Sequence, residues 1–168
     1  MEFENVIRDR YSCRKFSSKM IEDEKLEKIL EAGRIAPTAK NLQPFKILVV
    51  KSLDGIAKID EASPCRYGAP CVLVVCGDTE DAFHSDVFNS YEMDSSIVAT
   101  HMILEATNLG VNNIWIELFD KEMIQREFDL DDSLVPVCLL PMGYADEEAG
   151  PSHKHFERKE LEEIVEYR

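Results

Sequence analysis

The sequence has few of the features expected of a membrane protein or a nucleic-acid-binding protein. Only 19 Lys and Arg residues stand against 33 Asp and Glu residues, which gives a net charge of −14 at pH 7. Such an acidic surface repels nucleic acid and anionic lipid headgroups, so neither is an expected partner. No apolar run approaches the roughly 20 residues that are needed to cross a bilayer, so no membrane span is expected.

Disulfide and metal patterns are also missing. The five cysteines are odd in number and none forms a C-x-x-C pair, so we expect a reduced, cytoplasmic protein. Cys71, Cys76 and Cys138 lie in apolar runs and are expected in the core. His153 and His155 lack nearby carboxylate or cysteine partners that would complete a metal site, so we expect no metal.

The residues that are present predict one α+β domain that spans residues 1–168. A hydrophobic fraction of 45% and a charged fraction of 31% are typical of a globular domain with a sizeable core. We expect four strands, at Phe45–Val50, Cys71–Cys76, Val111–Glu117 and Val135–Leu140. We expect helices at Glu2–Arg8, Glu22–Arg34, Leu53–Asp60, Asp86–Leu109 and Lys121–Phe128, with a final helical turn or arm at Glu160–Val165.

The expected helix from Asp86 to Leu109 is apolar around most of its circumference. A helix of this kind is buried, either at the centre of a domain or against another subunit. Gly110 is its expected C-terminal stop.

One basic cluster stands out in this acidic chain. The segment from Arg10 to Phe16 reads RYSCRKF. In an extended segment, Arg10, Ser12 and Arg14 would point to the same side, and two guanidiniums with a hydroxyl suit a phosphate. The alternative is a solvated basic turn, because a short motif alone is only a hypothesis.

Four motifs together resemble the FMN-dependent nitroreductase family over nearly the full length of the chain. The first is RYSCRKF, which is similar to the family's phosphate segment. The second is the loop APTAKNLQPF at residues 36–45, bracketed by prolines. The third is NIWIELFD at residues 113–120, and the fourth is the C-terminal pattern GYADEE…FERKELEEIV. The resemblance implies a central, mostly antiparallel sheet flanked by helices, with the long helix at a dimer interface.

The resemblance also implies bound FMN, NAD(P)H as the electron donor and a nitro compound, quinone or similar acceptor. It implies a homodimer with the flavin between subunits, and a ping-pong reaction. Because the flavin supplies the difficult chemistry, no catalytic side chain is expected. The residues implied at the phosphate and ribityl chain are Arg10, Ser12, Arg14 and Arg158, and Tyr11 is a further implied cofactor-binding residue. Those approaching the flavin from the partner are Pro37, Thr38, Ala39, Asn41 and Gln43, and those beside its N5 atom are Glu117 and Leu118.

The chain also departs from the family pattern. The segments between Lys51 and Pro70 and after Gly77 are short, and Leu118 stands where many members have glycine. These regions often border the substrate pocket, so the acceptor is left open. Lys15 or Lys40 is expected to supply positive charge near the flavin N1 and C2 atoms, which would stabilise the reduced form.

Three alternative functions stay open. The chain could carry or sense FMN without turnover, or it could run other flavin chemistry such as dehalogenation or flavin breakdown. Without any flavin, it could be an α+β interaction module whose basic segment docks an acidic peptide. The flavin absorption of the purified protein separates this last alternative from the others.

Overall fold

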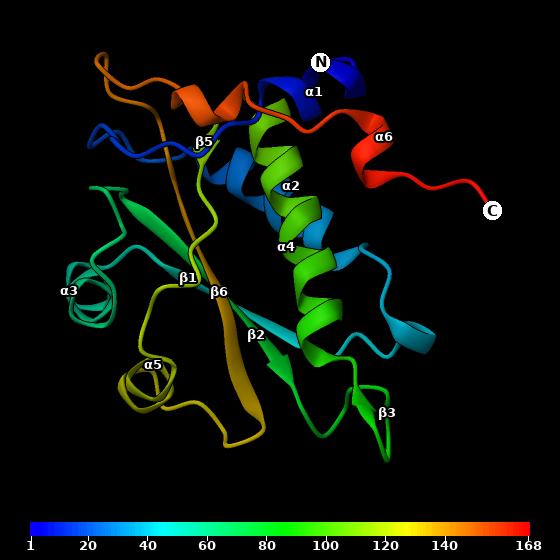
Figure 1. Cartoon of the computed structure of the whole chain (residues 1–168). Coiled ribbons are helices and arrows are strands. Elements are labelled where there is room, and N and C mark those ends of the chain that lie inside the picture. The colour runs from blue at the N-terminus through cyan, green and yellow to red at the C-terminus, as the bar shows by residue number, and fades with distance from the viewer.

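The computed structural model describes all 168 residues and has a four-stranded antiparallel sheet at its centre (Figure 1). The strand order is β1-β2-β6-β5. The strands are β1 (Phe45–Val50), β2 (Cys71–Asp78), β5 (Asn112–Asn113) and β6 (Leu134–Gly143). Every pair in the order is antiparallel, so the predicted α+β class and antiparallel sheet are confirmed.

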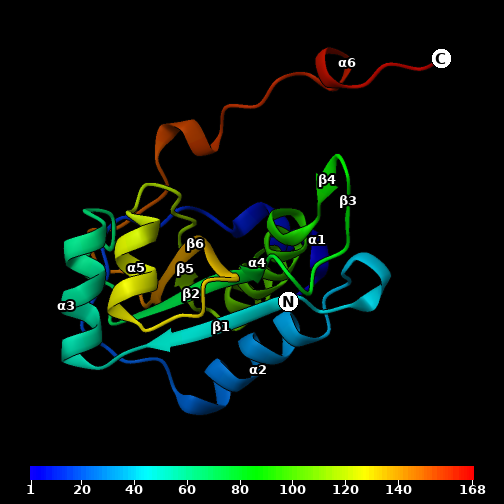
Figure 2. The same ribbon diagram turned by 90° about the horizontal axis from the view of Figure 1, so that it is seen from below.

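Helices cover both faces of the sheet. The elements on one side are α2 (Asp23–Arg34) and α4 (Tyr91–Asn108), and those on the other are α3 (Leu53–Ala62) and α5 (Lys121–Glu127) (Figure 2). The remaining elements are α1 (Phe3–Asp9), the 3₁₀ turns η1 (Ala39–Asn41) and η2 (His153–His155), the hairpin strands β3 (His84–Ser85) and β4 (Phe88–Asn89), and α6 (Leu161–Ile164). No helix is long and apolar enough to span a membrane.

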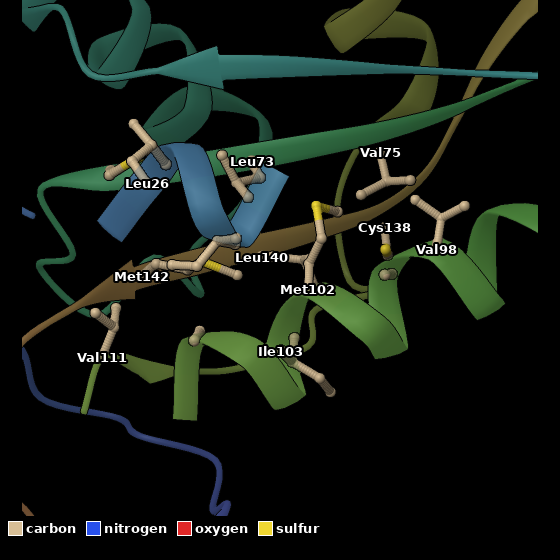
Figure 3. Packing of buried hydrophobic residues seen from close by; sticks show 14 of the residues in the cluster. Leu26, Leu73, Val75, Val98, Met102, Ile103, Val111, Cys138, Leu140 and Met142 are labelled. Atoms are coloured by element: carbon tan, nitrogen blue, oxygen red, sulfur yellow. The ribbon is translucent and has the colours of Figure 1, made fainter. Parts of the chain in front are cut away.

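Strand β2 explains the two-layered core. Its residues are apolar without alternation because both faces are covered. Leu73 and Val75 point into the cluster that contains α2 and α4, whereas Val72 and Val74 point into the cluster that contains α3 and α5. Figure 3 shows Leu73 and Val75 packed near Met102 of α4 in the first cluster. Burying a side chain of this size stabilises the fold by about 1.5–3 kcal/mol.

The prediction of one helix from Asp86 to Leu109 was wrong at its N-terminal end. Helix α4 begins at Tyr91, and the preceding residues form the β3–β4 hairpin. The Asn89 side chain accepts a hydrogen bond from the Tyr91 backbone N–H, and Phe83 and Phe88 pack with their ring centroids 6.5 Å apart. Local side-chain contacts therefore stop the helix, which apolar periodicity could not reveal.

The predicted strand Val111–Glu117 was too long. Only Asn112 and Asn113 form a ladder with β6, followed by an isolated bridge between Ile116 and Leu139. Pro141 of β6 accepts a hydrogen bond from the Ile114 N–H but has no N–H to return. The missing donor interrupts regular pairing at this edge of the sheet.

The two ends of the chain meet beside this edge. Residue Ser12 forms a parallel bridge with Asn113, and Phe16 forms an antiparallel bridge with Ala145. The C-terminal segment then passes over the N-terminal segment near α1 before it leaves the body of the molecule (Figures 1 and 2). The predicted C-terminal turn is present as α6, and its side chains are exposed.

Candidate cofactor site

A cationic pocket of about 440 Å³ lies where the N-terminal basic segment, Arg10–Phe16, meets the C-terminal segment. Its lining is polar and contains four Lys or Arg side chains and no carboxylate. The lining residues are Arg10, Ser12, Arg14, Ser152, Lys154, His155 and Arg158. The structure therefore brings together four of the residues that the resemblance assigned to the phosphate, including Arg158 from the far end of the chain.

Local backbone structure orients these side chains. The N-terminal segment is extended, and the Cys13 N–H donates to the Asn113 carbonyl at 3.0 Å, which fixes the segment against the sheet edge. With this alternation, Arg10, Ser12 and Arg14 share one pocket while the Cys13 side chain is fully buried. The alternating spacing of the motif is the cause of this arrangement.

The C-terminal side of the pocket is also held by backbone groups. The Arg158 guanidinium donates through Nη1 to the carbonyls of Glu157 and Lys154, at 2.6 and 3.3 Å. The Ser152 hydroxyl caps the η2 turn by accepting from the Lys154 N–H at 3.4 Å. Arg158 and Lys154 both line the pocket, and no carboxylate lines it with them.

Like charges face one another in this pocket. Burial, and then the positive charge of Arg158, lower the pKa of Arg10 from its ordinary value. Two guanidiniums in this position repel each other unless an anion lies between them. A phosphate monoester, with two negative charges and three acceptor oxygens, fits this donor set, so the residues present suit the phosphate of FMN.

Tyr11 lies next to this pocket and not in it. Its ring packs edge-on against His155 at 6.5 Å, and its hydroxyl accepts a hydrogen bond from Asn112 Nδ2 at 3.2 Å. It lines an adjoining pocket of about 640 Å³ together with His155 and Arg158. Tyr11 is therefore placed to support the wall that the two pockets share.

The proline-bracketed loop lies at the other end of α4. The Ala39 N–H donates to Asp94 in the first turns of this helix, whereas Arg10 and Thr107 line a common small pocket at its last turn. Asp94 and Thr107 are about 20 Å apart along the helix axis. Within one chain, the structure does not bring Pro37, Thr38, Ala39, Asn41 and Gln43 to the cationic pocket.

Residues Glu117 and Leu118 follow the last bridge of the β5 edge and are both exposed. Neither backbone N–H donates to another group of the chain. The Leu118 carbonyl accepts from the Ser63 hydroxyl at 2.7 Å, and the Glu117 carboxylate accepts from the Trp115 indole at 3.1 Å. The segment thus offers two free N–H donors on a backbone that side chains hold in place.

The structure distinguishes the two lysines considered for the flavin N1 side. The Lys15 ammonium pairs with Glu148 and, at 3.2 Å, with Asp146; hydrogen bonding to Glu148, and then to Asp146, raises the pKa of Lys15. The Lys40 ammonium lies 4.3 Å from the centroid of the Phe83 ring. The Lys15 ammonium is therefore paired with carboxylates outside the cationic pocket. The Lys40 ammonium, on the proline-bracketed loop, lies beside an aromatic ring instead.

Sequence reasoning missed three residues of the cationic pocket: Ser152, Lys154 and His155. They lie in a stretch that was expected to be irregular and solvated. The available signal was the basic run HKHFERK, which stands out in an acidic chain. Only Arg158 of this run was assigned a role, because the motif FERKELEEIV at residues 156–165 implies a phosphate contact for its arginine alone.

The fold and the cationic pocket agree with one protein class. The Nitroreductase family model matches residues 7–67 and 63–144, so the chain belongs to the nitroreductase family. A protein named NADH dehydrogenase from Thermus thermophilus is 28% identical over 196 residues, which cover 95% of this chain and 92% of that protein.

Solved structures support the same assignment. A nitroreductase family protein from Clostridium difficile 630 is 39% identical, with a TM-score of 0.93 over 99% of this chain and 98% of that one. The fold is also shared with a protein from Exiguobacterium sibiricum 255-15 that was solved in complex with FMN, at 22% identity and a TM-score of 0.86; the match covers 100% of this chain and 98% of that chain.

Proposed function

We propose that this NAD(P)H-dependent oxidoreductase binds FMN and passes electrons from NAD(P)H through the flavin to a quinone, nitro compound or similar acceptor. The observation that carries the proposal is the carboxylate-free pocket in which Arg10, Arg14 and Arg158 converge within a nitroreductase fold. We propose that the whole chain, residues 1–168, acts as one FMN-binding unit in the cytoplasm, where its five free cysteines would stay reduced.

The proposed roles follow from the geometry of each segment. Arg10, Arg14 and Arg158 hold the phosphate by charge-assisted hydrogen bonds, and the Ser12 hydroxyl adds a neutral donor. Bound FMN supplies hydride acceptance at N5 and release of electrons to the second substrate. The free N–H groups of Glu117 and Leu118 are proposed to donate toward N5, which would stabilise negative charge that develops on the flavin.

We propose a homodimer in which each flavin lies between subunits. The outward face of α4 carries Met93, which is 58% exposed, and an apolar pocket of about 300 Å³ lies between α1, α2 and α4. Phe3 and Ile35, which line this pocket, are 68% and 64% exposed. An apolar surface of this kind is typical of a protein–protein interface, and a second copy would cover it.

The separation of the two groups of candidate residues supports a shared site. The cationic pocket lies near the C-terminal end of α4, and the Pro37–Gln43 loop lies near its N-terminal end. In a twofold dimer packed along α4, the loop of one chain can approach the cationic pocket of the other. We therefore propose that the partner subunit supplies the loop residues of each flavin site, namely Pro37, Thr38, Ala39, Asn41 and Gln43.

The proposed substrates take turns at one flavin face, which gives a ping-pong reaction. Leu118 is 67% exposed, and it would stand at the approach to N5. A leucine there narrows the space available to a bulky acceptor compared with glycine. We therefore propose small or flat acceptors, such as quinones and nitroaromatics, over bulky ones.

The proposal is tested by titrating the apoprotein with FMN and then measuring NAD(P)H oxidation in the presence and absence of a quinone. We expect stoichiometric binding and quinone-dependent oxidation. Binding without NAD(P)H oxidation would instead support a flavin carrier or sensor, and the absence of FMN binding would contradict the proposal.

A further inference from the structure

Asp94 on α4 is a buried carboxylate whose side chain is bound only by neutral donors. The residue is 3% exposed. Its Oδ1 atom accepts from the Ala39 backbone N–H at 2.9 Å, and its Oδ2 atom accepts from the Ser90 hydroxyl at 2.7 Å. Burying a carboxylate without a cation is costly unless both oxygens are hydrogen-bonded. The two hydrogen bonds of this carboxylate tie the Ala39 backbone and the Ser90 side chain to Asp94.

The loop that Asp94 holds has an unusual backbone. Lys40, Asn41 and Gln43 have φ values of 51°, 57° and 55°, and these three are among only five non-glycine residues of the chain with positive φ. The backbone of a non-glycine residue rarely adopts a positive φ unless the surrounding structure imposes it. Within the loop, the Gln43 N–H donates to the Thr38 hydroxyl at 3.0 Å, but the Asp94 contact joins the loop to a helix.

The same carboxylate connects the loop with the base of the β3–β4 hairpin. Ser90, which donates to Asp94, donates its own backbone N–H to the Phe83 carbonyl at 2.9 Å. The Lys40 ammonium in turn lies over the Phe83 ring. The loop, the hairpin base and the start of α4 therefore form one closed network around Asp94.

We propose that Asp94 is a positioning residue that holds the Thr38–Gln43 loop in its left-handed conformation for contact with the flavin. The inference rests on the proposed FMN-binding function, because only that function gives the loop a ligand. A negative charge near the start of a helix also stabilises the helix by interacting with its dipole. This dipole effect alone requires neither the burial of Asp94 nor its hydrogen bond to Ala39, which is distant in the sequence.

The test uses hydrogen–deuterium exchange on the full-length apoprotein, followed by FMN titration. In Asp94→Ala, the hydrogen-bonded amides of the loop, those of Ala39, Asn41, Leu42 and Gln43, should exchange at least about tenfold faster, since a hydrogen bond to a charged group is lost. The amides of β2 should be unchanged, and FMN affinity should fall by roughly tenfold or more. Asp94→Asn should rescue both properties, because its amide oxygen can accept from the Ala39 N–H and its NH₂ group can donate to Ser90.

Ser95→Ala is the matched control. Ser95 is fully buried on the same turn of α4, and its hydroxyl has no partner, so its removal should leave loop exchange and FMN affinity unchanged. Loop exchange in Asp94→Ala that equals that of the wild type would overturn the proposal. If Asp94→Ala does not fold, Ser90→Ala, which removes one donor to the carboxylate, must speed up the same amides or the proposal fails.

The two measurements separate the role of Asp94 from the proposed function. Loop exchange is measured without FMN, so it judges the role of Asp94 even if the wild type binds no flavin. Wild-type FMN binding with no change in the Asp94→Ala loop contradicts only the positioning role. Faster loop exchange with no wild-type FMN binding supports the role of Asp94 in positioning the loop and contradicts the role of that loop in binding flavin.

Discussion

Arg10 and Arg158 come from opposite ends of the chain and line the same pocket, where the charge of Arg158 adds to burial in lowering the pKa of Arg10. No carboxylate lines this pocket to neutralise either guanidinium. The protein therefore keeps two like charges close together at the edge of its sheet. An anionic ligand would relieve this repulsion, and so the pair indicates binding more directly than either residue alone.

Arg14→Ala should weaken FMN binding by roughly ten- to a hundredfold, because a charge-assisted hydrogen bond to phosphate is lost. Arg158→Ala should act in the same direction. Arg34→Ala is the control, since Arg34 is a surface residue paired with Glu31, and it should leave the affinity unchanged. Titration with riboflavin, which has no phosphate, should show weaker binding that neither pocket variant alters; FMN affinity that is unchanged in Arg14→Ala would remove this residue from the phosphate site.

Steady-state kinetics with NAD(P)H and a quinone should give parallel double-reciprocal lines. The physical reason is that the two substrates occupy the same flavin face in turn. The measurement varies one substrate at several fixed concentrations of the other. Lines that intersect would show that both substrates bind together, and the single-face account would then be wrong.

The fold itself predicts a stability loss for Gly77→Ala. A Cβ atom at Gly77 would lie 2.8 Å from Tyr91 Cδ2 and 2.9 Å from both the Tyr91 carbonyl and Ser95 Oγ. Relieving this overlap requires β2 and α4 to move apart, at a cost of about 1–3 kcal/mol. Gly150→Ala is the matched control because a Cβ there meets nothing within 4 Å. Urea unfolding measures both, and equal stability of the two variants would argue against close packing of α4 on β2.

A hydrogen bond from the Tyr144 hydroxyl is the main cause that lowers the pKa of Glu22 to about 2, from an ordinary value of 4.5. Because this pKa is lower in the folded chain, the stabilising contribution is present above pH 4.5 and is lost as the pH falls through about 2. Tyr144→Phe should raise the pKa of Glu22 toward its ordinary value in a carboxyl NMR titration. Tyr167→Phe, at an exposed position, should not; an unchanged Glu22 pKa in Tyr144→Phe would assign the shift to another group.

Much of the fold could be predicted because its strongest signals are local. The strand Phe45–Val50 was predicted with its observed bounds, and β2 was recognised from its continuous apolar run. The start of α4 could not be predicted in this way, since Asn89 ends the hairpin through a side-chain contact that leaves no periodic signal. The short β5 depends on Pro141 in another strand, which is a non-local cause.

The residues of the candidate site also divide into those with a local sequence signal and those that only non-local structure brings together. The alternation of Arg10, Ser12 and Arg14 was visible in the sequence, and all three line one pocket of the structure; their contact with a phosphate stays a prediction. The addition of Arg158 relied on the family resemblance, because no local pattern links the two chain ends. Lys154 and His155 join the pocket only through the path of the C-terminal segment, so the sequence alone could not assign them.

We propose that the cationic pocket of one subunit and the Thr38–Asn41 segment of its partner complete each FMN site. This arrangement can be tested with two differently tagged chains that are co-expressed and purified as a mixed dimer. One chain carries Arg10→Ala with Arg14→Ala, and the other carries Thr38→Trp with Asn41→Ala. Homodimers of each variant, which should bind little FMN, are the controls.

The decisive measurement is the amount of FMN bound per mixed dimer, relative to the wild type. If the two segments act across the interface, one site carries all four changes and the other carries none, so we predict about half of the wild-type flavin. If both segments serve the same chain's flavin, each site keeps one pair of defects, and almost no bound flavin would contradict the shared site.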